Sequence, residues 1–147
     1  MNDPIVVGTD GSPSADRAVQ RAGELAQALG GEVHVVSSYQ THLAGGWAGA
    51  AAGVAVAELA AVEDARARAE EVVAAAKERL AQYDLDVRTH VRGDEPAQAL
   101  VSVAADTRAH MIVVGNRGMS GARRVLGSVP NRVSHNSRVA VLIVPTS

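Results

Sequence analysis

The chain has 147 residues, a formal net charge of -2 and 47% hydrophobic residues, which predicts one packed domain over residues 1–147. Cysteine is absent, so disulfides, thiolate zinc sites and cysteine nucleophiles are excluded. Aromatic residues make up only 2%, and basic residues are not in excess, which argues against a nucleic-acid-binding module. The sequence contains no signal-type segment and no apolar run of the roughly 20 residues that a membrane span needs. We therefore expect a cytoplasmic protein that binds neither nucleic acid nor membrane.

The first part of the chain alternates an apolar run, a helical pattern and a second apolar run. Residues 4–10 are a short β-branched run, typical of a strand buried on both faces of a parallel sheet. Ser12 and Pro13 predict the N-cap and first position of a helix, which a Gly-Gly pair ends. Residues 32–38 predict a second strand, parallel to the first because the connection is too long for a hairpin.

In the middle of the chain, a stretch rich in Gly and Ala interrupts the alternation of strand and helix patterns. Residues 40–56 are rich in Gly and Ala and predict a loop, and a helical pattern follows from about residue 56 to residue 83. Residues 85–91 alternate apolar and polar side chains, which predicts a strand at an edge of the sheet. The Gly-Asp-Glu-Pro stretch at residues 93–96 predicts a turn and the start of the next helix.

A glycine-rich segment separates the last two predicted strands, residues 110–115 and 139–144, and a short helix over about 129–136 follows it. The segment's four glycines are Gly115, Gly118, Gly121 and Gly127. Glycines allow close approach of a ligand to the backbone, and free N–H groups at a helix start attract anions. Alternating β and α units of this length predict an α/β, doubly wound domain with a five-stranded parallel sheet.

Two strand ends carry residues suited to a ligand. In open parallel sheets, ligands bind beyond the carboxyl ends of the strands, where the strand order reverses. Gly8-Thr9-Asp10 ends the first strand, and Gly115-Asn116-Arg117-Gly118 ends the fourth. These two ends face each other if the strands are neighbours, which periodicity does not establish. Nearby cations indicate a small anionic ligand: Arg117, Arg123, Arg124 and Arg132.

Neither a Gly-x-x-x-x-Gly-Lys-Ser/Thr motif nor an early Gly-x-Gly-x-x-Gly motif is present, so classical P-loop and dinucleotide enzymes are not expected. Instead, three stretches together resemble the universal stress protein family over essentially the whole chain. They are Val-Val-Gly-Thr-Asp-Gly-Ser at residues 6–12, Gly115-x-x-Gly118, and Gly-Ser-Val-Pro-Asn-Arg-Val-Ser-His at residues 127–135. The resemblance implies a three-layer α/β sandwich, Rossmann-like, with strand order 3-2-1-4-5, and a homodimer through residues 139–144.

The ATP-binding branch of this family implies a nucleotide site. Asp10 would lie near the ribose and a phosphate-bound Mg2+, and the backbone of Ser38 would meet adenine. The implied cofactor-binding residues are Gly8, Thr9, Asp10, Ser38, Val114, Gly115, Arg117, Gly118, Gly127, Ser128 and Val129. Eight residues separate Gly118 from Gly127, one fewer than is usual in that branch, which leaves ATP, AMP and cyclic AMP open.

Three functions follow as hypotheses. The first is a sensor or regulator of the stress response that binds an adenine nucleotide, ATP first. The second is a slow ATPase or nucleotide-dependent transferase. The sequence indicates no general base and no other catalytic residue, which argues against this second hypothesis. The third is a ligand-free dimeric adaptor. The five histidines share no metal-ligand spacing and are expected at the surface or at strand ends.

Overall fold

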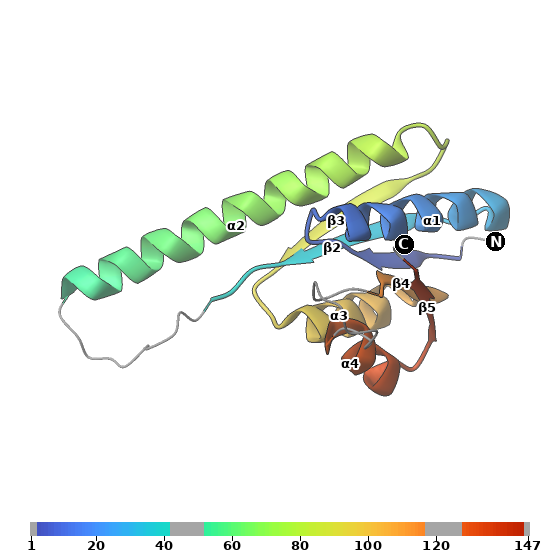
Figure 1. Ribbon diagram of the computed structural model, residues 1–147. Coiled ribbons are helices and arrows are strands. Elements are labelled where there is room, and N and C mark those ends of the chain that lie inside the picture. Colours follow the sequence, from blue (N-terminus) through green and yellow to red (C-terminus); the bar gives the residue numbers. More distant parts are fainter. Residues whose placement is uncertain (1–2, 42–51, 117–127, 146–147) are drawn as a thin grey trace.

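The structure is a computed structural model that describes residues 3–41, 52–116 and 128–145 (Figure 1). Strands and helices alternate along these residues, as the sequence predicts. In chain order the elements are β1 (Ile5–Gly8), α1 (Pro13–Leu29), β2 (Val33–Ser38), α2 (Ala52–Leu80), β3 (Val87–Arg92), α3 (Pro96–Thr107), β4 (Met111–Gly115), α4 (Ser128–Asn136) and β5 (Ala140–Val144).

The five strands form one sheet in the order β3-β2-β1-β4-β5, with every neighbouring pair parallel. This confirms the order 3-2-1-4-5 and the predicted edge position of the more polar third strand. Because β1 lies between β2 and β4, the ends of β1 and β4 are adjacent, with Val7 in register with Val113. The reversal of strand order therefore falls between the two strand ends that the sequence singles out.

Helices cover both faces of the sheet, which confirms the three-layer architecture (Figure 1). On one face, α1 and α2 pack over a cluster that includes Ile5, Val35 and Leu80. On the other face, α3 and α4 enclose a second cluster that includes Val6, Leu100 and Val133. Successive residues of β1 contribute to opposite clusters, as expected for a strand buried on both sides. Within the described residues, no helix combines the length and the apolar character needed to cross a bilayer.

The predicted helix signals are present in the structure. Ser12 is the N-cap of α1, where its Oγ accepts a hydrogen bond from the Ala15 N–H at 3.2 Å, and Pro13 follows at the first helical position. Gly30 ends α1 in the left-handed conformation, with φ of 71°. Glu95 is the N-cap of α3, where its side chain accepts hydrogen bonds from backbone N–H groups, and Pro96 follows at the first helical position.

The bounds of α2 and β3 differ from those predicted. The helix α2 begins at Ala52, so the end of the predicted loop over 40–56 is wrong; residues 42–51 lie outside the described residues. Alanine has the highest helix propensity, and this Ala-rich stretch extends the helix despite one glycine. The helix ends at Leu80, and residues 81–83 form a turn instead. The strand β3 begins at Val87, two residues later than predicted.

Candidate functional site

A cavity of about 230 Å³ lies beyond the carboxyl ends of β1, β2 and β4, between the starts of α1, α3 and α4. This is the location at which open parallel sheets bind ligands. The residues that line it are Gly8, Thr9, Asp10, Ser12, Ser14, Ala15, Val36, Ser38, Pro96, Leu100, Val114, Gly115, Val129 and Pro130.

The connection from β1 to α1 forms the polar side of the cavity. The Thr9 N–H donates to the Val36 carbonyl at 3.0 Å, which continues the sheet by one residue. Asp10 Oδ1 accepts a hydrogen bond from the Ser12 N–H at 2.9 Å, and Gly11 between them has φ of 81°, which favours glycine. This turn fixes the backbone while leaving Asp10 exposed to solvent.

One hydroxyl on this polar side has no hydrogen-bond partner among the described residues. Ser14 lies in the first turn of α1, and its Oγ atom is buried without a hydrogen bond to any described residue. A Cβ atom built on Gly115 would lie 3.0 Å from this Oγ, so the hydroxyl sits directly against the end of β4. By contrast, the hydroxyls of Thr9 and Ser12 both accept hydrogen bonds from nearby backbone N–H groups.

The opposite side of the cavity is apolar and comes from the second core cluster. Val36 and Val114 supply the strand side chains, and Leu100, Val129 and Pro130 supply the helical ones. Gly8 allows this packing, because a Cβ at that position would lie 3.1 Å from both methyl carbons of Leu100. A ligand in the cavity would therefore meet polar groups on the α1 side and an apolar wall on the α3 and α4 side.

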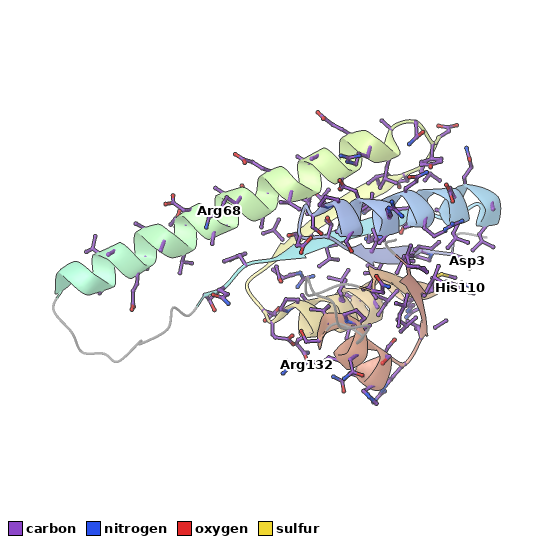
Figure 2. All side chains as sticks on the ribbon, viewed as in Figure 1. Asp3, Arg68, His110 and Arg132 are labelled. Carbon is purple, nitrogen blue, oxygen red and sulfur yellow. The ribbon has the colours of Figure 1, made fainter. Side chains whose placement is uncertain are left out.

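An ion pair joins the two helices that carry the apolar wall. Arg132, on α4, places its Nη1 atom 3.2 Å from Oε1 of Glu95, the N-cap of α3. Figure 2 shows Arg132 beside α4, away from Asp3 and His110, which lie just before β1 and β4 begin. Of the four arginines that the sequence places near the glycine-rich segment, Arg132 is the one among the described residues.

The structure brings together seven of the eleven sequence-predicted binding residues around the cavity. These seven are Gly8, Thr9, Asp10, Ser38, Val114, Gly115 and Val129. Ser128 is exposed at the first position of α4 and is not part of the lining. Arg117, Gly118 and Gly127 lie outside the described residues.

Sequence reasoning did not place the remaining lining residues at the site. Ser14 lies in the first turn of a helix, where serine is common, and only its position against Gly115 distinguishes it from the neighbouring Ser12. Val36, Leu100 and Pro130 have the same pattern as core residues, since they belong to or border the core as well as the cavity. The position of Pro96 at the start of a helix was predicted, but its place at the cavity was not.

The predicted metal ligand, Asp10, is the single carboxylate among the described residues that line the cavity. Among the described residues, no group of three His, Cys, Asp or Glu side chains is arranged to hold a metal ion. Mg2+ commonly takes one or two carboxylates together with phosphate oxygens and waters. Asp10 therefore fits a Mg2+ ion whose other ligands come from a bound phosphate chain and water.

The expectation that histidines lie at the surface or at strand ends is wrong for His34. This side chain lies within β2, is only 4% exposed, and contacts both Glu32 and His90. Burial lowers the pKa of His90, and the neighbouring His34, Arg92 and Arg88 lower it further, while Asp106 raises it. None of these residues lines the cavity.

Comparison with known proteins gives a consistent family. The model of the universal stress protein family matches residues 1–145. Universal stress protein Rv1636 of Mycobacterium tuberculosis is 35% identical over 160 aligned positions, which cover 97% of this chain and 96% of that protein.

Solved structures are similar over nearly the whole chain. A universal stress protein crystallised in complex with cAMP is 34% identical, with a TM-score of 0.73 and coverage of 99% of this chain and 98% of the other. A universal stress protein from Archaeoglobus fulgidus in complex with dAMP is 26% identical, with a TM-score of 0.67 and coverage of 96% of both chains.

Proposed function

Because this chain belongs to the universal stress protein family, we propose that its cavity binds an adenine nucleotide and that the protein acts as a homodimeric sensor or regulator of the stress response in the cytoplasm. ATP is the first candidate, with AMP and cyclic AMP as alternatives. Binding would act through a change of shape or of partner, since the described part of the cavity offers no pair of residues suited to rapid turnover.

The observation that carries this proposal is the two-sided lining of the cavity. Val36, Leu100 and Pro130 form an apolar wall on which a planar base can pack. Asp10 and the start of α1 supply polar groups for a sugar. The start of α4 at Ser128 offers backbone N–H groups for phosphate, because the first turn of a helix has unpaired donors and a positive dipole end.

The comparisons support the same ligand class. Two solved relatives of at least 26% identity hold adenine nucleotides, one cAMP and the other dAMP. Both ligands carry a single phosphate group, whereas a bound triphosphate would bring Mg2+, for which Asp10 is the proposed ligand. Seven of the residues proposed to bind the nucleotide already surround the cavity.

A calorimetric titration with ATP, AMP and cyclic AMP, with and without Mg2+, tests the proposal. We expect binding of at least one nucleotide, and tighter ATP binding with Mg2+ than without it. Asp10→Asn should remove this Mg2+ effect. Asp16→Asn is the matched control, because Asp16 lies on α1 outside the cavity and pairs with Arg79. Absence of binding by every nucleotide would refute the proposal.

The proposed homodimer uses β5, which forms one edge of the sheet. Leu142 in the middle of this strand is 36% exposed, and Val141 and Ile143 are partly exposed. An apolar edge strand with free backbone groups is a template for pairing with another strand. A second copy of β5 would supply both the backbone partners and apolar cover.

Light scattering after size-exclusion chromatography tests this interface. Leu142→Asp should convert a dimer into a monomer, because it places a charge in the proposed interface. Leu59→Asp is the matched control, since Leu59 is 66% exposed on α2, away from β5. A wild-type monomer, or a dimer that survives Leu142→Asp, would contradict the placement.

A further inference from the structure

Ser14 is the polar group at the cavity that the described structure leaves without a hydrogen-bond partner. Other polar groups on this side are engaged: Ser12 caps α1, Thr9 accepts from the Gly11 N–H, and one Asp10 oxygen accepts from the Ser12 N–H. A buried hydroxyl without a partner is unfavourable, because it has lost its hydrogen bonds to water. Such a group in a binding cavity points to a ligand that completes it.

The surroundings of Ser14 indicate which part of a nucleotide would reach it. Ser14 lies between the turn that carries Asp10 and the end of β4, where its Oγ sits against Gly115. A phosphate is disfavoured here, since its negative charge would meet the Asp10 carboxylate without an intervening metal. The apolar wall on the opposite side suits the base instead.

A sugar hydroxyl matches both groups at once. The Asp10 carboxylate only accepts hydrogen bonds, whereas the Ser14 hydroxyl both donates and accepts. A ribose hydroxyl can donate its proton to Asp10 while it accepts one from Ser14. Ser14 lines the cavity, and another staggered rotamer of its single side-chain torsion would let the hydroxyl leave Gly115 and meet such a ligand.

We infer that Ser14 is a specificity-determining residue that hydrogen-bonds a ribose hydroxyl, so that the site discriminates ribonucleotides from deoxynucleotides. This inference rests on the proposed nucleotide-binding function and identifies the sugar that the site prefers. The two solved relatives described above hold one ribonucleotide and one deoxynucleotide, so membership of the family does not by itself decide between these sugars.

The test is a titration of AMP, 2′-deoxy-AMP and 3′-deoxy-AMP in EDTA, which removes any metal bridge to Asp10. For the wild-type protein, we expect one deoxy analogue to bind about threefold to tenfold more weakly than AMP, the effect of one hydrogen bond. Ser14→Ala should abolish this difference by weakening AMP while leaving that analogue unchanged. Ser14→Cys, which has a weak donor of similar size, should retain only a fraction of it.

Ser134→Ala is the matched control and should keep the wild-type ratio, because Ser134 lies exposed on α4 outside the cavity. Circular dichroism establishes that each variant is folded. The inference is overturned if the wild-type protein binds AMP and both analogues equally, or if Ser14→Ala keeps the difference. If the wild-type protein binds none of the three, and ATP and cyclic AMP also fail, the proposed function itself is overturned.

Discussion

Nδ1 of His34 lies 2.8 Å from Nε2 of His90, a hydrogen bond that joins β2 to the edge strand β3. The other nitrogen of His34, Nε2, lies 2.8 Å from Oε1 of Glu32. A carboxylate accepts only, so His34 Nε2 donates to it. In a neutral His34 ring, Nδ1 is then an acceptor, and His90 must donate from Nε2. The three side chains form one chain of hydrogen bonds with fixed direction.

The direction of these bonds predicts the tautomers of the two rings. At pH 8.5 we expect both His34 and His90 to carry the proton on Nε2. Long-range 1H–15N correlation spectra of the imidazole rings measure this directly, because protonated and unprotonated nitrogens have different chemical shifts. An Nδ1-protonated His34 would contradict the bond to Glu32 in the orientation described.

Protonation of His90 should destabilise the fold. Because His90 already donates from Nε2, a second proton adds to its Nδ1 and leaves the hydrogen bond to His34 intact. The cost comes from burial of the charged ring, to which His34, Arg92 and Arg88 add and which Asp106 only partly offsets. The folded-state pKa of His90 is lowered from 6.5, so the unfolded chain binds more protons near that pH. The stabilisation is therefore fully present above pH 6.5 and is lost as the pH falls through the lower folded-state pKa.

Urea unfolding at pH 7.5 and pH 5.0 measures this dependence. His90→Gln should lose less free energy of unfolding between the two pH values than the wild-type protein loses. His135→Gln serves as the control, because His135 is exposed on α4, and should show the wild-type loss. Equal losses in His90→Gln and the wild-type protein would assign the acid sensitivity to other groups.

Gly23 permits the close approach of α1 and α2. A Cβ built on Gly23 would lie 2.6 Å from two ring carbons of Tyr83 and 2.7 Å from Cδ2 of the buried Leu80. In an ordinary helix Gly→Ala is stabilising by about 1 kcal/mol. Here we expect Gly23→Ala to destabilise the protein by about 1–3 kcal/mol in urea unfolding, because overpacking outweighs propensity.

A double-mutant cycle with Tyr83→Ala checks the cause. Removing the ring relieves most of the overlap, so Gly23→Ala should cost less in the Tyr83→Ala background than in the wild-type protein. An equal cost in both backgrounds would show that the ring is not the obstacle.

The sequence predicted those parts of the fold that depend on residues close together in the chain. The β-branched run at residues 4–10 predicted a strand, which forms over Ile5–Gly8. The cap at Ser12 and the helix start within residues 93–96 follow from local signals and appear as predicted. The order of the strands did not follow from periodicity, because pairing joins segments far apart in the chain. It came from resemblance to a family, which carries that long-range information.

Side chains whose roles depend on distant residues could not be placed. His34 alternates with apolar residues in β2, and nothing local shows that it meets His90 across 56 positions of sequence. The role of Ser14 depends in the same way on Gly115 of a later strand. Asp10 could be placed at the cavity because its contiguous motif, taken together with two other stretches, resembles the family. The start of α2 at Ala52 was not predicted, because a stretch rich in Ala and Gly can form either a loop or a helix.

Glu95 should stabilise the start of α3 mainly as a helix cap. Its Oε1 and Oε2 accept hydrogen bonds from the N–H groups of Ala97 and Gln98, at 3.3 and 3.4 Å, and Arg132 lies 3.2 Å from Oε1. Both side chains of the ion pair are largely exposed, so solvent screens the pair and the cap contributes more. We expect Glu95→Ala to reduce the free energy of unfolding by about 1 kcal/mol, and Arg132→Ala to reduce it by less than about 0.5 kcal/mol. Glu95→Gln keeps a capping oxygen and should lose less than Glu95→Ala in the same urea measurement. Equal losses in Arg132→Ala and Glu95→Ala would instead assign the stabilisation to the ion pair between α3 and α4.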